Sequence, residues 1–135
     1  MRIRRDVLES IVAHARRERP RECCGLLIGT DEEVLEAVAA TNVAADPLRH
    51  YEVSPADHFA QIRRCRESAT ERPVSVVGGY HSHPRTAPEP SATDLELAFE
   101  GFLYLIAGPA SEDTVDVRAY QLKAGRLERI DLQTY

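Results

Sequence analysis

One stretch near the middle of the chain combines the pattern of a buried strand with a pair of histidines: residues 73–84, which read PVSVVGGYHSHP. β-Branched and apolar residues dominate its first part, which is typical of a strand. We therefore predict a strand over Pro73–Tyr80 that runs directly into His81, Ser82 and His83. Because side chains alternate between the faces of a strand, both imidazoles should point to the same side.

Two imidazoles on one side of a strand can share a metal ion, although an isolated His-x-His often occurs by chance, with solvated side chains. Zinc accepts His nitrogen and Asp oxygen at about 2.0 to 2.2 Å, and catalytic sites use three protein ligands plus a water. Asp94 follows the pair after a loop over Pro84–Pro90 that contains three prolines. This stiff loop can turn back and present Asp94, in the first turn of a helix, as the third ligand.

Two further residues could take part in chemistry at this strand end. Ser91 can be the N-cap of the helix that carries Asp94, and its hydroxyl can also donate a hydrogen bond to an oxyanion beside a metal. Glu22 precedes the apolar run Cys23–Ile28, which we expect in the same sheet as the histidine strand. A carboxylate there could reach the site, although Glu22 beside Arg21 also fits an ordinary surface residue.

The remaining pattern predicts an α/β (α+β) fold with one mixed sheet and two or three helices. Helices are expected over Asp6–Arg19, with Asp6 as cap and Pro20 as stop; from Ser54 or Asp57 toward Pro73; and around Asp94. Strands are expected over Cys23–Ile28 and Val34–Val43 as a hairpin, Tyr51–Val53, Phe102–Ala107, and the closing hairpin Thr114–Leu122 with Arg126–Leu132.

Length and composition indicate one soluble domain over residues 1–135, with 43% hydrophobic and 29% charged residues. A net charge of -5 disfavours a general nucleic-acid binder. No run approaches the apolar length of a membrane span and no signal region opens the chain, so we expect a cytoplasmic protein without membrane partners. The odd number of cysteines fits a reducing compartment.

Several residues with reactive side chains receive structural interpretations. We assign three cysteines to the core, because free cysteines are among the most buried residues: Cys23, Cys24 and Cys65. Three histidines lack partners at ligand spacing and are interpreted as surface or capping residues: His14, His50 and His58. Gly78 and Gly79 do not form a phosphate loop; small residues here allow close backbone approach near the site.

Taken as a set, Glu22, His81-Ser82-His83-Pro84, Ser91 and Asp94 resemble the full signature of the JAMM (MPN+, Mov34/PAD-1-like) zinc metallopeptidase family. The resemblance covers essentially the whole chain, from the first helix through residues 22–29 to the closing strands, and it is closest to the compact prokaryotic single-domain type. It implies the JAMM/MPN fold, in which a mixed, curved sheet is flanked by two or three helices. That fold is related to the cytidine-deaminase-like architecture.

The resemblance also implies roles for individual residues. His81, His83 and Asp94 would bind Zn²⁺, Glu22 would act as general acid/base on the metal-bound water, and Ser91 would steady the oxyanion. No position of the signature is missing, in contrast to metal-free relatives that act as scaffolds. The implied reaction is hydrolysis of a peptide or isopeptide bond after the C-terminal glycine of a small ubiquitin-like or sulfur-carrier protein.

Length and motif content disfavour two other classes of zinc enzyme. Barrel amidohydrolases also use His-x-His at a strand end, but such barrels need about 250 residues. Zinc deaminases need a Pro-Cys-x-x-Cys pair, which this chain lacks. Two alternatives stay open: an inactive MPN-type binding or assembly module, and a general small amidase or peptidase without a protein partner. The sequence does not predict the oligomeric state.

Overall fold

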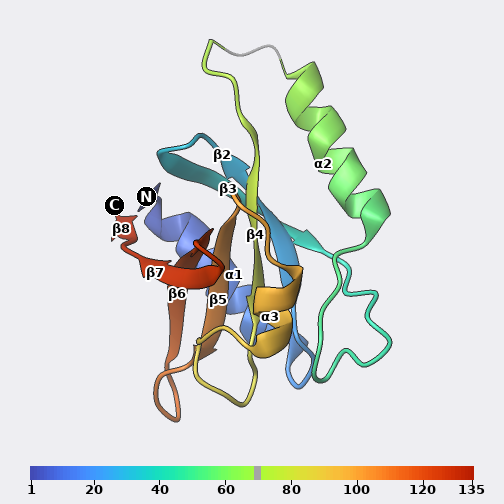
Figure 1. The fold of residues 1–135 in the computed structure, drawn as a ribbon, viewed down its shortest axis with the longest axis vertical. Coiled ribbons are helices and arrows are strands. Elements are labelled where there is room, and N and C mark those ends of the chain that lie inside the picture. The colour runs from blue at the N-terminus through green and yellow to red at the C-terminus, as the bar shows by residue number, and fades with distance from the viewer. Residues whose placement is uncertain (69–70) are drawn as a thin grey trace.

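A computed structural model describes residues 1–68 and 71–135 of the protein (Figure 1). The described residues form three helices: α1 (Arg5–Glu18), α2 (Pro55–Glu67) and α3 (Ala92–Leu97). They also form eight strands: β1 (Arg2–Ile3), β2 (Cys24–Gly29), β3 (Glu33–Ala40), β4 (Ser75–Ser82), β5 (Leu103–Pro109), β6 (Val115–Lys123), β7 (Arg126–Ile130) and β8 (Gln133–Thr134).

The strands make one mixed sheet in the order β7-β6-β5-β4-β2-β3-β1-β8. β4 lies in its interior, antiparallel to β2 and parallel to β5, and α3 forms the crossover between β4 and β5. In Figure 1 the sheet is strongly curled, with α1 and α3 on opposite faces and α2 leaning against one end of β4. The predicted mixed sheet with flanking helices is confirmed, as are the two predicted hairpins.

The two faces of the sheet bury different sets of residues. On the α1 face, Ile11, Leu27 and Leu105 are completely buried in the main core. On the other face, alternate residues of β5, Tyr104 and Ile106, form a smaller cluster. Since side chains alternate along a strand, the residues of β4 are divided between the same two faces.

Two predicted element boundaries were wrong. Asp6 is not the cap of α1: the N-cap is Arg4, and the Asp6 carboxylate instead accepts a hydrogen bond from the Arg4 guanidinium at 2.8 Å. In the first turn, that carboxylate still favours the helix dipole. Tyr51–Val53 is not a strand, because among the residues that the structure describes its one strand-like pairing is an isolated bridge between Val53 and Asn42. This segment belongs to a loop between β3 and α2.

The second helix is capped as predicted but packs less deeply than expected. Ser54 is its N-cap, and the helix ends at Glu67. No residue of α2 is buried, and Cys65 is only half-buried, so its assignment to the core was wrong. α2 packs mainly against β4, and its contact with β3 includes the surface ion pair between Arg64 and Glu36, so its apolar side is only partly covered. β1 and β8 were not predicted, because two residues carry no periodicity.

Beneath the strand that carries the histidines lies a buried polar pair. His14 of α1 is 6% exposed, and its Nδ1 lies 2.8 Å from the Tyr80 hydroxyl, so the prediction of a surface histidine was wrong. Burial lowers the pKa of His14. Cys23 and Cys24 are buried free thiols, as predicted. Among the described helices, none is long and apolar enough to cross a membrane.

β4 approaches its neighbouring strands so closely that two of its glycines have little room for a side chain. A Cβ added at Gly78 would overlap the backbone carbonyl oxygen of Leu103, whereas one added at Gly79 would lie 3.2 Å from the Gly25 carbonyl oxygen. We expect Gly78→Ala to lower the free energy of unfolding by about 1–3 kcal/mol or more, because backbone cannot move aside as a side chain can. Urea titration measures this, with Gly79→Ala as the milder control. Equal losses in both variants would contradict the packing described.

Candidate metal and catalytic site

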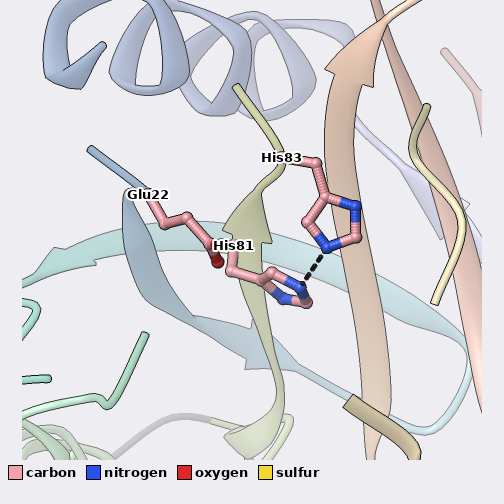
Figure 2. Close-up of side chains that lie close together, drawn as sticks. All are labelled: Glu22, His81 and His83. Atoms are coloured by element: carbon pink, nitrogen blue, oxygen red, sulfur yellow. Dashed lines mark hydrogen bonds between the residues drawn. The ribbon is translucent and has the colours of Figure 1, made fainter. Parts of the chain in front are cut away.

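The end of β4 brings the two predicted histidines together. His81 lies in β4 and His83 directly follows it, and their Nε2 atoms are 3.2 Å apart (Figure 2). The exposed fraction is 1% for His81 and 8% for His83. Because His81 pairs with Ile106, it lies on the face opposite α1, whereas Tyr80 points toward α1. The expectation that both imidazoles share one side is confirmed.

Asp94 comes back to the histidines at the start of α3. Its Oδ1 lies 3.1 Å from Nε2 of His81, and its Oδ2 lies 3.2 Å from Nε2 of His83. In a tetrahedral site with bonds of about 2.0–2.1 Å, neighbouring ligand atoms are about 3.3 Å apart. The three observed separations are close to that spacing, so this donor set fits one small divalent ion.

Ser91 fixes the conformation of Asp94 through a capping box. The Ser91 hydroxyl oxygen accepts a hydrogen bond from the Asp94 backbone N–H at 3.0 Å, and the Ser91 N–H donates to the Asp94 carboxylate at 2.8 Å. The predicted N-cap role is therefore observed. These bonds cap a helix start while holding the carboxylate toward the histidines. The hydroxyl proton of Ser91 is not used in either bond.

Glu22 reaches the same place from the segment that leads into β2. The register pairs Cys24 with His81, and the Cys23 N–H donates to the Ser82 hydroxyl at 2.8 Å, so Glu22, two residues before β2, lies beside the end of β4. Ligand atoms of Glu22, His81 and His83 all lie within 4.8 Å of one another. The Glu22 side chain is buried, and Figure 2 shows it beside the two imidazoles. Burial raises the pKa of Glu22 to about 7, against the opposing effect of His83.

The electrostatics of the three clustered groups follow from burial and mutual hydrogen bonding. Burial lowers the pKa of His81, although Asp94 opposes it. Burial also acts to lower the pKa of His83, but bonds to Asp94 and the Ala87 carbonyl outweigh it and the net pKa is raised. Burial acts to raise the pKa of Asp94, but bonds from both imidazoles outweigh it and hold the pKa well below its usual range.

The tautomer of His83 is set by a backbone carbonyl of the proline loop. Its Nδ1 lies 3.1 Å from the Ala87 oxygen. A carbonyl can only accept, so Nδ1 carries a proton and Nε2 is the nitrogen left for an ion. The loop itself is held by the Tyr120 hydroxyl, which donates to the Pro88 carbonyl at 2.7 Å. The stiff loop thus positions both Asp94 and the ring of His83.

Sequence reasoning missed Tyr51, which lies against the site. Its ring stacks on His81 with centroids 4.1 Å apart and an interplanar angle of 15°. Tyr51 is also in the lining of two cavities. The smaller, of about 130 Å³, is lined by Glu22, His83 and Asp94 among others. The larger, of about 610 Å³, has a mainly apolar lining that includes Phe99. An aromatic residue in a loop without periodicity gave no signal of this contact.

All five residues singled out from the sequence therefore meet at one end of β4: Glu22, His81, His83, Ser91 and Asp94. Three of them offer a nitrogen or oxygen donor at ligand spacing. Glu22 adds a buried carboxylate with a shifted pKa, and Ser91 adds a neutral hydroxyl. A ligand set with an additional acid/base group is the arrangement used for metal-assisted hydrolysis.

Comparison with known proteins agrees with the JAMM (MPN+) resemblance of the sequence along most of the chain. The family model for prokaryotic homologs of the JAB domain matches residues 4–123. The chain is 41% identical to the desampylase of Haloferax volcanii over 77% of each chain. It is 32% identical to the CysO-cysteine peptidase of Mycobacterium tuberculosis, over 91% of this chain and 83% of that one. Identity to the probable TtuB-protein conjugate cleaving protease of Thermus thermophilus is 34%, over 90% and 76%.

Solved structures show the same fold over the full chain. A protein of Desulfitobacterium hafniense superposes with a TM-score of 0.83 and 26% identity, covering 100% of this chain and 93% of that one. A structure described as a JAMM metalloprotease-like zinc site in the proteasome and signalosome superposes with a TM-score of 0.60 and 22% identity, covering 100% and 97%. The second likeness concerns the fold alone.

The donor geometry predicts metal affinity that depends on Asp94. We expect Asp94→Asn to weaken zinc binding by more than about 100-fold, because it removes the negative charge of a ligand. Loss of a residue that merely hydrogen-bonds to a metal ligand already lowers metal affinity by about 10–100-fold. Competition with a chromophoric chelator measures the change. His58→Ala, which removes a histidine of α2, is the matched control and should keep the affinity of the unmodified protein. Unchanged affinity in Asp94→Asn would show that the ion binds elsewhere.

Proposed function

Since the chain belongs to the prokaryotic JAB-domain (JAMM/MPN+) family of peptidases and isopeptidases, we propose that it is a zinc-dependent enzyme that hydrolyses a peptide or isopeptide bond. The observation that carries this proposal is the convergence of two imidazoles and one carboxylate at ligand spacing, with a second buried carboxylate beside them. A scaffold without catalysis would have no need of this fourth group.

In this proposal His81, His83 and Asp94 hold the ion. The nitrogen that His83 leaves free, and the fixed carboxylate of Asp94, support that assignment. When bound, zinc lowers the pKa of a coordinated water to about 7 and polarises the carbonyl of the scissile bond. The chain itself contributes orientation, because the two histidines are buried and the capping box and the proline loop hold Asp94 and His83.

Glu22 is proposed as the general acid/base. Its carboxylate takes a proton from the attacking water and later gives it to the leaving amine, so that one group serves both halves of the reaction. In the metal-free protein burial raises the pKa of Glu22 to about 7, so this carboxyl group holds a proton more readily than an exposed one, as a group that accepts and later donates a proton must. Ser91 is proposed as the donor that steadies the oxyanion, since its hydroxyl proton stays available while its oxygen caps α3.

We propose a small ubiquitin-like or sulfur-carrier protein as the substrate, cleaved after its C-terminal glycine. Relatives named for a CysO-cysteine bond and for TtuB-protein conjugates support this class. The cavity of about 610 Å³ supports it as well, because it adjoins the site and shares Tyr51 and Leu97 with the smaller cavity. Gly79, which has no side chain, lines its wall.

The role of Glu22 is tested by separating metal binding from turnover. We expect Glu22→Gln to keep zinc at the level of the unmodified protein and to lose about 10²–10⁴-fold in kcat, because the amide cannot transfer the proton. Metal analysis of the purified variant beside its kinetics measures both. Full activity in Glu22→Gln, or loss of its zinc, would refute the role given to this residue.

The substrate class is tested with carrier-protein fusions. Each carrier is joined through its C-terminal glycine to an amino acid, a peptide or a lysine side chain, and release is followed by mass spectrometry. We expect cleavage after the glycine, and a strong loss of rate when that glycine is replaced by alanine in the carrier. Equal rates on unrelated short peptides would point instead to a general peptidase, and no cleavage of any amide by the zinc-loaded protein would favour a binding module.

A further inference from the structure

Asn42, in the loop between β3 and α2, uses the full hydrogen-bonding capacity of its side chain. Its Nδ2 donates to the carbonyl oxygens of Glu22 and His50, both at 3.0 Å. Its Oδ1 accepts from the backbone N–H groups of Ala44 at 3.0 Å and Glu52 at 3.1 Å. A carboxamide offers two donor hydrogens and two acceptor lone pairs, and all four are used here.

Two of these four bonds lie on either side of Tyr51. The carboxamide holds the carbonyl of His50 and the N–H of Glu52, so the backbone before and after Tyr51 is fixed by one planar group. A further bond from the Val43 N–H to the Glu52 carbonyl, at 2.9 Å, closes the loop. The Tyr51 ring carried by this backbone is the ring that stacks on His81.

A third bond connects the same carboxamide to Glu22. Its carbonyl accepts from Asn42, and its N–H donates to the Pro47 carbonyl at 2.8 Å, so both backbone groups of Glu22 are bound by this one loop. The following residue, Cys23, donates its N–H to the Ser82 hydroxyl at 2.8 Å, which ties Glu22 to the end of β4. Loop and sheet together therefore determine where the Glu22 carboxylate lies.

We propose that Asn42 is a positioning residue that fixes Tyr51 against His81 and Glu22 beside the histidine pair. It contacts neither side chain and acts only through backbone groups. Aspartate at this position would keep the acceptors and lose both donors, so it would release Glu22 and His50 while adding a charge that repels their carbonyls. The consequence for catalysis rests on the proposed function, whereas the consequence for geometry does not.

The geometric part is tested by NMR on the metal-free protein. A ring stacked at 4.1 Å shifts the imidazole proton resonances of His81 upfield, and Tyr51→Leu defines the position of these resonances without the ring. We expect Asn42→Asp and Asn42→Ala to move them most of the way toward Tyr51→Leu. Gln61→Ala, which removes a surface carboxamide of α2, should leave them unchanged. Unchanged His81 resonances in both Asn42 variants would overturn the proposal.

The unmodified protein supplies a test that does not depend on the folding of a variant. Asn42 is the only asparagine in the sequence, so labelling with ¹⁵N-asparagine gives a single side-chain amide pair. We expect both of its protons to exchange with solvent at least tenfold more slowly than those of a free asparagine side chain. Exchange of either proton at the free rate would show that the bonds to Glu22 and His50 do not persist.

The catalytic part is tested by kinetics with the zinc-loaded enzyme on a cleavable carrier fusion. We expect Asn42→Asp to lower kcat at least tenfold, because Glu22 is misplaced, and to raise KM as well, because the released loop that carries Tyr51 also lines the larger cavity. A residue that only stabilises the loop would leave kcat unchanged below the unfolding temperature, and that outcome would overturn the catalytic part. Absence of turnover in the unmodified enzyme would refute the proposed function while leaving the NMR result for Asn42 intact.

Discussion

The register between β2 and β4, in which Cys24 pairs with His81, is the constraint on which the site depends. It brings Glu22, which is far away in sequence, to the end of the strand that carries the histidines. A slip of one residue would turn His81 toward α1 and Tyr80 toward the site, because side chains alternate between faces. The pairing of Gly25 with Tyr80 resists such a slip, because the Tyr80 ring fills the space that any side chain at position 25 would need.

The same groups that complete secondary structure also prepare the site for chemistry. The capping box of α3 satisfies orphan backbone donors and simultaneously aims Asp94 at the histidines. The carbonyl of Ala87 in the proline loop fixes the tautomer of His83. The side chains of Asp94 and His83 are thus already fixed before an ion binds, so binding costs less conformational entropy.

The part of the site that could be predicted is the part carried by periodicity and local motifs. The alternation along β4 predicted that His81 and His83 share one side, and the cap pattern predicted the place of Asp94. The parts that were missed depend on contacts between distant segments: Tyr51 on His81, and His14 under Tyr80. Loops and two-residue strands have no period, so neither the loop after β3 nor β1 and β8 could be derived from pattern alone.

The proposed function requires that His81, His83 and Asp94 bind one zinc ion together. X-ray absorption at the zinc edge tests it most directly on protein loaded with one equivalent of metal. We predict two imidazole nitrogens and further oxygen ligands, all at about 2.0–2.2 Å. Sulfur scattering at about 2.3 Å, which would indicate thiolate ligands, or a spectrum with no imidazole contribution, would contradict it.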